Sequence, residues 1–344
     1  MKYQNKLKTI KKILTKHKAN QIILKSTDPN FKWLLEKEIT KATLIITRKE
    51  NILLTKPLES INKEFLKKDL KILTIKNNKE LKKINIKGLT LTNHEQITLK
   101  DKEELNLRRT KDINTELQEL RSQKNEEEIK KIKTACNHAV KCWKQIIKKL
   151  EKKELNTEKQ IEQHIKIYAL RNNLGLAFNP VVASGKNAGI PHHEPQKKLN
   201  KGFLVIDLGF DYEGYKSDMT RTIYLGKPTN QEKQIYEELL NVQETMIKKT
   251  RTGIKAKKLY EETLRIMKKP ELFIHGLGHG VGLEIHEKPS IKPDSEDIIR
   301  KSQVLTIEPG YYENYGIRIE DTIIIKEKPI ILTKKAPKTL KIIQ

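Results

Sequence analysis

Two segments that each carry a pair of acids constrain this chain more than any other feature of its sequence. The first, FLVIDLGFDYEGYKSDMTRTIYL, contains Asp207 and Asp218, and the second, LTIEPGYYENYGIRIEDTIII, contains Glu308 and Glu320. In both segments, β-branched and apolar runs flank a turn rich in Gly, Asn, Asp and Tyr, a pattern that predicts a β-hairpin. We therefore expect this part of the chain to fold around two acid-bearing hairpins.

The symmetry of each hairpin about its turn predicts where the acids lie. The first pair is symmetric about the Tyr212–Glu213 midpoint and the second about Asn314. Each acid is therefore expected directly opposite its partner, with Cβ atoms about 4.5–5.5 Å apart. Two carboxylates so placed on an apolar strand pair repel each other and destabilise the fold unless a cation lies between them.

The sequence around these acids argues against simple exposure to solvent. A single Asp or Glu in a hairpin is usually solvated. Asp207, however, follows the run 203–206 (FLVI), which is typical of a strand buried on both faces, and Glu320 lies between Ile319 and the run 323–325 (III). Two buried pairs of acids in one domain predict a cluster of cations.

A glycine-rich segment, FIHGLGHGVGLEIHEKP, adds three histidines, His275, His279 and His286. A strand-like run at 272–274 precedes them. Four interleaved glycines disfavour a helix and allow the backbone to approach another group closely. Alternation is expected instead, with His275, Leu277 and His279 directed to one side. A lone histidine is more often structural than a ligand, but three so close together indicate chemistry.

From about Leu120 to about Thr333, the sequence resembles the pita-bread metallopeptidases and, within them, the Xaa-Pro peptidases (prolidase and aminopeptidase P). The matching pieces are LRSQKNEEEIKKIKTAC, FNPVVASGKNAGIPHHEP, VIDLGFDYEGYKSDMTRT, HGLGHGVGLEIHEKP, LTIEPGYY and GIRIEDT, in family order and at family spacing. Five separated ligand positions match together with their flanking patterns, which makes the resemblance specific.

The resemblance implies a site with two metal ions. Asp207 would bind one ion, His279 and Glu308 would bind the other, and Asp218 and Glu320 would bridge the two. These roles come from the family and not from the hairpin argument. Carboxylates with one imidazole suit first-row divalent ions better than a thiolate-type site does. We expect two divalent ions per chain, Mn²⁺ or Co²⁺ ahead of Zn²⁺ or Fe²⁺.

The resemblance also implies the reaction, which is hydrolysis of the peptide bond before proline by a hydroxide that bridges the metal ions. A pair of ions about 3.5–4 Å apart can generate such a nucleophile near neutral pH. In that reaction, His286 would donate a hydrogen bond to the oxyanion, His192 would contact the substrate near the scissile bond and Glu308 would shuttle a proton. Arg318, on the same strand face as the last ligand, and His275 are expected around the ligands or the substrate.

Composition limits the other functions. The 344-residue chain has a net charge of +26, which comes from scattered lysines, and its aromatic content is only 5%. Nucleic-acid sites instead concentrate arginine and aromatic side chains, so no specific nucleic-acid partner is expected.

Cellular context follows from three features of the sequence. Cys136 and Cys142 lie on one predicted helix and do not face each other, so no disulfide framework is expected. The start, MKYQNKLKTIKKILTKHK, lacks the apolar region of a secretory signal. No apolar run approaches the roughly 18 residues that a membrane span needs. We expect a cytoplasmic protein with no membrane contact and, by the resemblance, a homodimer.

The chain is expected to form two domains and an α+β fold, with a small α/β domain over residues 1–115 and a pita-bread catalytic domain over 116–344. The catalytic domain would pack its helices on a curved antiparallel sheet. The boundary is placed near the polar stretch 110–119. The first domain is expected to contain an amphipathic helix with Leu7, Ile10, Ile13 and Leu14, followed by strands at Gln21–Leu24, Ala42–Thr47 and Asn51–Thr55.

Helix signals are clear in the second domain. Apolar spacing predicts a long amphipathic helix that buries Ile129, Ile132, Ala139, Trp143 and Ile147. Two capping boxes, Thr157 with Gln160 and Thr229 with Glu232, predict the starts of two further helices, and Gly175 is expected to end the first of these.

Three other interpretations remain open: a methionine aminopeptidase of the same fold, a creatinase-like hydrolase, and a non-catalytic module that binds protein or nucleic acid. The preceding α/β domain argues against the first, and the complete set of ligands argues against the other two. Whether the substrates are dipeptides or longer peptides is also open. Some prolidases have an Arg at the position of Ser290, and an Arg binds a substrate carboxylate well. In this chain, Ser290 lies between Lys288 and Lys292.

Overall fold

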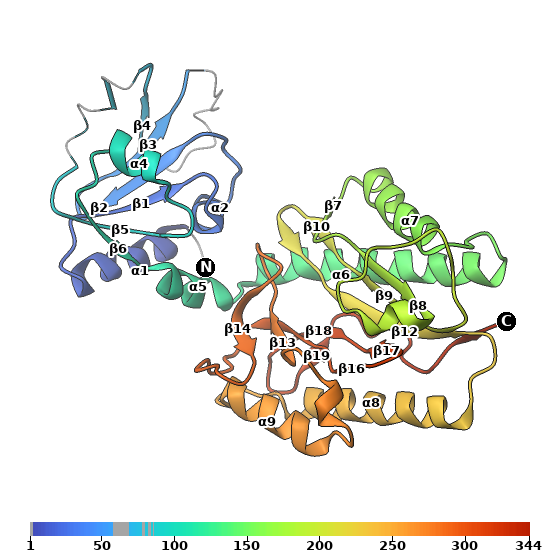
Figure 1. The fold of residues 1–344 in the computed structure, drawn as a ribbon. Coiled ribbons are helices and arrows are strands. Elements are labelled where there is room, and N and C mark those ends of the chain that lie inside the picture. Colours follow the sequence, from blue (N-terminus) through green and yellow to red (C-terminus); the bar gives the residue numbers. More distant parts are fainter. Residues whose placement is uncertain (1–2, 58–68, 78–79, 82–83, 85) are drawn as a thin grey trace. The chain divides into compact units, whose positions relative to one another are not determined.

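The computed structural model describes residues 3–57, 69–77, 80, 81, 84 and 86–344 (Figure 1). It divides into two compact units, Met1–Arg121 and Ser122–Gln344. This division lies six residues after the boundary that the sequence placed at residue 115. The polar stretch around residues 110–119 is not a loop, because it contributes to strand β6 (Arg109–Asp112) and helix α5 (Asn114–Ser122).

The first unit is a mixed sheet with strand order β4-β3-β2-β1-β5-β6. Strands β1, β2 and β3 pair antiparallel, whereas β4, β5 and β6 join the sheet in parallel. The first three strands are confirmed to within one residue at the ends, and the predicted first helix is present as α1 with its apolar face buried. The elements of this unit, besides β6 and α5, are α1 (Tyr3–Lys16), β1 (Gln21–Lys25), α2 (Pro29–Leu35), β2 (Thr43–Thr47), β3 (Asn51–Thr55), β4 (Leu70–Thr74), β5 (Leu89–Thr92) and α4 (Leu99–Glu104).

The second unit contains several short sheets covered by helices. Every strand pair in it is antiparallel except β12 with β20. The α+β class predicted from the sequence is therefore confirmed. The helices are α6 (Glu126–Glu151), α7 (Glu158–Arg171), α8 (Asn230–Lys249) and α9 (Ala256–Ile266), with 3₁₀ turns η2 (Gly185–Gly189) and η3 (Pro270–Leu272). The strands are β7 (Gly175–Leu176), β8 (Val181–Ser184), β9 (Gly202–Leu208), β10 (Phe210–Tyr212), β11 (Tyr215–Lys216), β12 (Met219–Leu225), β13 (Gly278–Gly280), β14 (Glu287–Ile291), β15 (Val304–Ile307), β16 (Gly310–Tyr312), β17 (Gly316–Arg318), β18 (Asp321–Ile324), β19 (Ile330–Ile331) and β20 (Ile342–Ile343).

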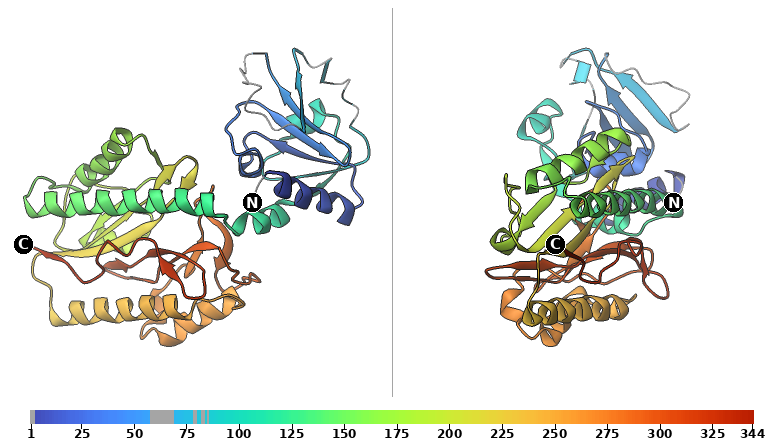
Figure 2. Two further views of the ribbon diagram at one scale, coloured as in Figure 1. Left: turned by 180° about the vertical axis from the view of Figure 1, so that it is seen from behind. Right: turned by 90° about the vertical axis from the view of Figure 1, so that its right-hand side faces the viewer.

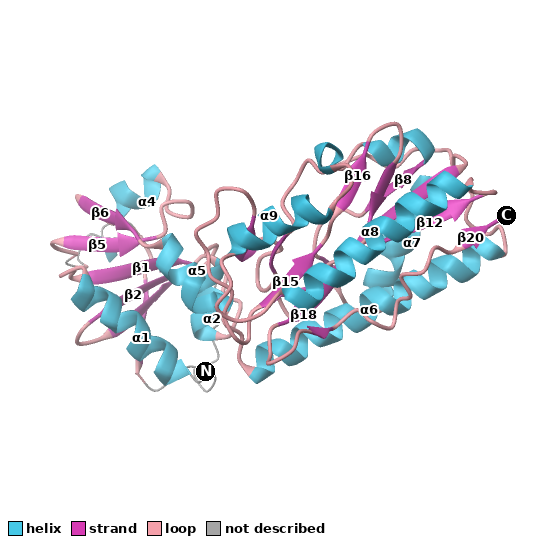
Figure 3. Ribbon diagram, turned by 90° about the horizontal axis from the view of Figure 1, so that it is seen from below, coloured by secondary structure: helices cyan, strands magenta, loops and turns pink. Residues whose placement is uncertain are grey.

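The sheets of the second unit lie between two helical layers. One apolar core joins α6 and α7 to β8, β9 and β12, and a second joins α8 and α9 to β15 and β18. Figure 2 shows α6 and α8 on opposite sides of the strands, and Figure 3 shows that both helices run lengthwise along this unit. Helix α6 buries the predicted apolar face, including Ile129 and Trp143, and its Cys136 and Cys142 are both buried and free.

Both predicted helix starts are confirmed, but only one of the two capping boxes is complete. Thr229 forms a full box with Glu232 at the start of α8. Thr157 caps α7 by accepting from the amide of Gln160, whereas the Gln160 side chain accepts from the amide of Asn156, so this box is half formed. The prediction that Gly175 ends α7 is wrong. The helix ends at Arg171, and Asn173 takes the left-handed conformation (φ 53°) that usually follows a helix.

The aspartate hairpin differs in register from the prediction. Asp207 lies opposite Thr220 and not opposite Asp218. The turn consists of Glu213 and Gly214, which both have positive φ (52° and 86°), as a two-residue type I′ turn requires. The sequence argument placed the turn one residue too early, which shifted the pairing by two. Asp218 is therefore a diagonal neighbour of Asp207 on the same face of the hairpin.

The glutamate hairpin has the register that its symmetry predicts. Val304 lies opposite Ile324 in the β15–β18 pair, and Gly310 lies opposite Arg318 in the β16–β17 pair. Both pairs are symmetric about Asn314. The same register places Glu308 opposite Glu320, between the two regular ladders.

Threonine side chains join the two hairpins side to side. The Thr322 hydroxyl donates to the backbone carbonyl of Asp218 (2.6 Å), and the Thr222 hydroxyl donates to that of Arg318 (2.8 Å). One backbone bond, from the amide of Glu320 to the carbonyl of Thr220 (3.1 Å), lies between them. We call this junction of residues 218–222 with 318–322 the hairpin seam. It brings two of the predicted ligand positions, Asp218 and Glu320, to one place.

A buried ion pair reinforces the hairpin seam. Arg221 and Asp321 lie 2.6 Å apart, and their side chains are 1% and 0% exposed. Arg221 also donates to the carbonyls of Thr220 and Glu320, the residues on either side of the seam. Burial opposes ionisation of Asp321, but the charges of Arg221 and Lys338 outweigh it and lower the pKa of this carboxyl group.

We predict that Arg221→Met lowers the free energy of unfolding of the second unit by about 3–5 kcal/mol, because removing one partner leaves a buried charge without its main counter-ion. Exposed Arg251 offers a matched control, and Arg251→Met should change stability by no more than about 0.5 kcal/mol. Denaturant unfolding followed through Trp143, in a Trp33→Phe background, measures this unit alone. Equal stability of the two variants would show that the pair does not hold the seam.

Candidate metal centre

The five predicted ligands come from the ends of five separate strand segments that meet beside the hairpin seam. They are Asp207 in β9, Asp218 just before β12, His279 in β13, Glu308 just after β15 and Glu320 just before β18. Ligand-type side chains from positions up to about a hundred residues apart in the sequence thus face one small volume.

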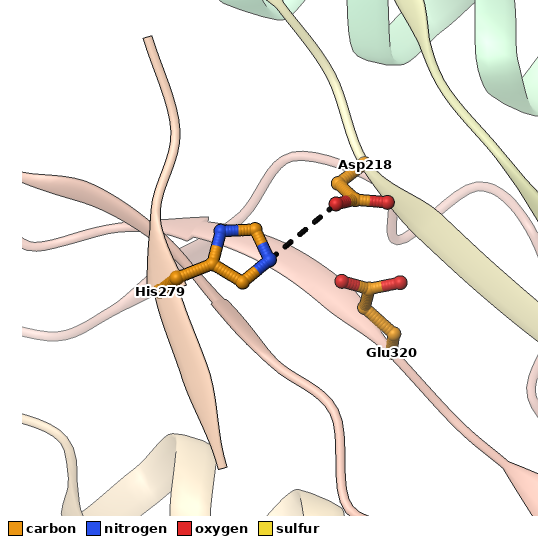
Figure 4. Close-up of side chains that lie close together, drawn as sticks. All are labelled: Asp218, His279 and Glu320. Carbon is orange, nitrogen blue, oxygen red and sulfur yellow. Dashed lines mark ion pairs between the residues drawn. The ribbon is translucent and has the colours of Figure 1, made fainter. Parts of the chain in front are cut away.

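Three of these residues form the tightest group. One atom from each of Asp218, His279 and Glu320 lies within 4.8 Å of the others, a spacing that could hold a metal ion. Figure 4 shows the three side chains directed toward a common space from different strands. His279 Nε2 lies 3.6 Å from Asp218 Oδ2 and 3.4 Å from Glu308 Oε1, so Glu308 borders the same space.

Asp207 is held beside this group by Arg318. The Arg318 Nη2 lies 2.6 Å from Asp207 Oδ2, and both side chains are largely buried. Arg318 Nε donates to the Thr220 hydroxyl (3.1 Å), which itself donates to Glu320 Oε2 (2.8 Å). One guanidinium therefore orients Asp207 directly and Glu320 through Thr220, as its predicted role requires.

Buried oxygens without partners mark the space between these acids. Asp207 Oδ1, Asp218 Oδ1 and Glu320 Oε1 have no hydrogen-bond partner among the residues that the structure describes. Leaving a buried charged acceptor unsatisfied is costly. Four carboxylates and one imidazole form a donor set that first-row divalent metal ions accept. The residues present therefore fit a metal centre.

The electrostatics of the group show the strain that a cation would relieve. Burial, and then the charges of neighbouring carboxylates, raise the pKa values of Asp218 and Glu320 well above the ordinary range. Burial, with the charge of Asp207, raises the pKa of Glu308 to about 7. Burial, and then the neighbouring His286, lower the pKa of His279 to about 3, so its imidazole is neutral and able to coordinate.

The other predicted histidines surround the group. The His286 ring is exposed and packs edge-on against His279, with ring centroids 4.3 Å apart. His275 Nε2 lies 2.9 Å from the hydroxyl of Tyr312, which accepts from Arg318. Burial, and then Arg318, lower the pKa of His275 to about 4. His192 is exposed on the loop after η2, and its charge helps to lower the pKa values of both His275 and His286, which burial mainly sets.

Glycines allow the histidine segment to pass close to its neighbours, as the sequence predicted. A Cβ at Gly278 would lie 2.0 Å from the carbonyl oxygen of Thr306, and one at Gly280 would lie 2.2 Å from that of Lys288. The prediction of a strand at residues 272–274 is wrong, because η3 occupies Pro270–Leu272. Proline favours the first position of such a helical turn. Regular strand structure in this segment is limited to β13 at Gly278–Gly280 and the start of β14 at Glu287.

Sequence reasoning missed two polar residues of the centre. Thr220 connects Arg318 to Glu320, and Tyr312 connects Arg318 to His275. Thr220 lies two residues after Asp218, so strand alternation would have placed it on the ligand face. No comparable signal marked Tyr312, because its role depends on Arg318 reaching across the hairpin.

Comparison with known proteins agrees with this geometry. Residues 130–327 match the model of metallopeptidase family M24. Over 235 residues, the chain is 38% identical to the Xaa-Pro dipeptidase of Pyrococcus furiosus, a match that covers 66% of this chain and 67% of that protein. Its fold is similar to that of the prolidase from Pyrococcus horikoshii OT3 (TM-score 0.86, 28% identity, 98% of this chain and 100% of that one). It is also similar to the X-Pro aminopeptidase from Thermotoga maritima MSB8 (TM-score 0.81, 25% identity, 94% and 97%). The predicted pita-bread fold is confirmed.

We predict that Thr220→Val weakens the binding of divalent metal by about 10- to 100-fold, because the substitution removes the hydroxyl that orients Glu320. Thr263 is an equally buried threonine that bonds only within α9, so Thr263→Val should leave metal affinity unchanged. Competition for Co²⁺ against a chromophoric chelator compares the two variants. Similar affinities in both would show that Thr220 does not support the centre.

Proposed function

The chain belongs to metallopeptidase family M24, and on that premise we propose that it hydrolyses the peptide bond preceding proline. The substrates are Xaa-Pro dipeptides and short peptides with an Xaa-Pro N-terminus. The observation that carries the proposal is the set of three unpartnered buried carboxylate oxygens beside His279, within a chain 38% identical to an Xaa-Pro dipeptidase.

The proposed centre holds two divalent metal ions, bound by Asp207, Asp218, His279, Glu308 and Glu320. When all four carboxylates are ionised, they face a single guanidinium, that of Arg318, and the remaining negative charge exceeds what one divalent cation can neutralise. When bound, such ions supply an activated water near neutral pH and polarise the scissile carbonyl. We propose Mn²⁺ or Co²⁺ in these positions, because the ligands are carboxylates with one imidazole.

The chain's own residues supply the remaining functions. Glu308 borders the centre, and its carboxylate would take a proton from the attacking water and deliver it to the leaving proline nitrogen. Exposed His286 would donate a hydrogen bond to the carbonyl oxygen as negative charge develops there. Although His286 is accessible to solvent, the protein surrounds part of its ring, and this partial burial lowers the pKa of His286. The ring is therefore neutral at pH 7 and donates through one nitrogen. His192, exposed on its loop, would contact the substrate near the scissile bond.

Two features of the structure bear on substrate length. The lysines that flank Ser290 are both engaged by acids, since Lys288 lies 2.7 Å from Asp297 and Lys292 lies 3.5 Å from Asp294. The amide of Ser290 also donates to Asp297. Neither lysine is therefore set up as a rigid clamp for a free carboxylate. This supports activity on peptides longer than dipeptides as well as on Xaa-Pro itself.

The alternative functions have less support. A non-catalytic module or a creatinase-like hydrolase would not need all five ligand-type side chains. Here all five are present, and three of them have a buried carboxylate oxygen without a hydrogen-bond partner among the described residues. A methionine aminopeptidase would not account for the small α/β unit that precedes the catalytic one. In the part of the chain that the structure describes, no helix is long and apolar enough to cross a membrane. A cytoplasmic homodimer remains part of the proposal.

We predict that the purified chain binds about two divalent ions and loses activity on chelation, with Mn²⁺ or Co²⁺ restoring it. Asp218→Ala should abolish turnover, because it removes a shared ligand and leaves its acidic neighbours unneutralised. Asp211, on the same hairpin but paired with Lys216 (2.8 Å), is the control, and Asp211→Ala should stay active. Elemental analysis with an Xaa-Pro assay tests this, and a fully active metal-free protein would contradict it.

We predict that His286→Ala lowers kcat on the order of 10²–10³-fold, because an oxyanion donor is lost, while metal content stays that of the wild type. His94, an exposed histidine of the first unit, serves as control, and His94→Ala should change neither quantity. If His286→Ala instead arrived without metal, His286 would be a ligand and its assigned role would be wrong.

We predict that amidation of an Xaa-Pro dipeptide lowers kcat/KM by less than about tenfold, because both nearby lysines already have acidic partners. The measurement compares Xaa-Pro, its C-terminal amide and an Xaa-Pro tripeptide. A larger loss on amidation would reveal a carboxylate clamp and a strict dipeptidase. No preference for proline at the second position would contradict the proposed specificity.

A further inference from the structure

The loop that carries His192 has almost no regular structure of its own. It connects β8 to β9, and the 3₁₀ turn η2 is its one regular element. A catalytic or substrate-contacting side chain needs a well-defined position, because a displacement of about 1 Å can lower the rate by about 10²-fold. Contacts from outside the loop must therefore define where His192 lies.

A single buried carboxylate, that of Glu158, makes most of these contacts. Glu158 is the first residue of α7, and its side chain is 0% exposed. Its Oε1 accepts from the amide and the hydroxyl of Ser184 (both 2.7 Å) and from Asn187 Nδ2 (3.1 Å). Its Oε2 accepts from His193 Nε2 (2.9 Å) and from the amide of Gln196 (2.8 Å). The five donors span the loop from its start to beyond His192.

The start of helix α7 strengthens this arrangement. A carboxylate is stabilised at a helix N-terminus, where backbone amides without helical partners concentrate positive charge. Two of those amides also donate hydrogen bonds to the loop. The amide of Glu158 donates to the carbonyl of Lys198 (3.3 Å), and the amide of Lys159 donates to the carbonyl of Gln196 (3.0 Å). Burial opposes ionisation of Glu158, but the hydrogen bonds from Ser184, Gln196, His193 and Asn187 outweigh it and lower the pKa of this carboxyl group.

A tight turn links Glu158 to His192. The amide of His193 donates to the carbonyl of Ile190 (3.1 Å), which closes a β-turn with Pro191 second and His192 third. Proline is favoured at the second position of such turns because its φ is already fixed. The His193 side chain is only 9% exposed and faces Glu158, whereas His192 is exposed. Holding His193 thus fixes the backbone on one side of His192.

The glutamate hairpin fixes the other side of the loop. A Cβ at Gly316 would lie 1.7 Å from the carbonyl oxygen of Ala188, so the loop backbone lies directly on β17. Ala188 is 2% exposed. The loop is therefore confined between the hairpin that carries the glutamates and the N-terminus of α7.

We propose that Glu158 is a positioning residue: its carboxylate holds His193 and, through the Ile190–His193 turn, fixes His192 in the place where it contacts the substrate. The inference rests on the proposed function for the role of His192. The side chain of Glu158 bonds to Ser184, Asn187, His193 and Gln196, none of which belongs to the metal centre. Its removal should therefore change catalysis without changing metal content.

The kinetic test combines Glu158→Gln with His192→Ala. An amide has one acceptor oxygen where the carboxylate has two. In Glu158→Gln, either the donors of His193 and Gln196 at Oε2 or those of Ser184 and Asn187 at Oε1 therefore lose their acceptor, and the loop is held less firmly in both cases. We expect Glu158→Gln to lower kcat/KM by about 10- to 100-fold in the otherwise wild-type chain. In the His192→Ala background, the same change should alter kcat/KM by less than about twofold, because the residue it positions is already gone.

A neighbouring acid provides the matched control. Glu162 lies one helical turn along α7, is also buried, and pairs with the side chains of Lys159 (2.5 Å) and Lys166 (2.6 Å) and not with a residue of the loop. Glu162→Gln should leave both kcat/KM and metal content at wild-type values. If the losses in kcat/KM of Glu158→Gln and His192→Ala multiply in the double variant, the proposal is overturned. If Glu158→Gln does not fold, His193→Gln enters the same cycle, and multiplying effects there would overturn it equally.

A second measurement does not depend on activity. Diethyl pyrocarbonate modifies accessible imidazoles, and fragment mass spectra distinguish His193 from His192. His193 should be protected in the wild type and in Glu162→Gln, and at least about tenfold more reactive in Glu158→Ala, since that change removes the acceptor of the His193 bond. Unchanged protection of His193 in Glu158→Ala would overturn the proposal whether or not the wild type has Xaa-Pro activity. Absence of that activity in the wild type would instead contradict the proposed function.

Discussion

The burial of several carboxylates in one space, where they also repel each other, is the constraint on which the rest of the second unit depends. Burial opposes the charged forms of Asp218, Glu308 and Glu320, and the charges of neighbouring carboxylates add to this cost. Arg318 offsets part of it through Asp207. The unpartnered oxygens show where neutralisation is incomplete. A fold that keeps such a group of acids must be stabilised by contacts elsewhere, and the group needs a cation to neutralise its remaining negative charge.

The hairpin seam supplies the other means. Threonine hydroxyls and one buried ion pair align residues 218–222 with 318–322, so the positions of Asp218 and Glu320 do not rely on their own side-chain contacts. Helices α6 and α8 pack the seam from opposite sides (Figure 2). Outside the centre, the carboxylate of Glu158 bonds to the loop that carries His192. Stability and chemistry are thus assigned to different residues, and each can be changed separately.

Much of this arrangement could be predicted from the sequence. Strand runs such as 203–206, the register about Asn314 and the identity of the acids all follow from local patterns, because alternation and turn symmetry act within one hairpin. The register of the aspartate hairpin was wrong because the turn is Glu213–Gly214, a difference of one residue that local apolar patterning does not resolve. Two of the remaining contacts, those of Thr222 with Arg318 and of Arg221 with Asp321, join segments about a hundred residues apart. The contact of Tyr312 with Arg318 crosses one hairpin. No local sequence signal encodes such contacts.

Anomalous diffraction from crystals of the chain grown with Mn²⁺ tests the central claim most directly, because it locates the ions without reference to activity. We expect two anomalous peaks inside the group formed by Asp207, Asp218, His279, Glu308 and Glu320, with Arg318 still bound to Asp207. A centre without peaks at saturating Mn²⁺, or ions bound elsewhere in the second unit, would contradict it.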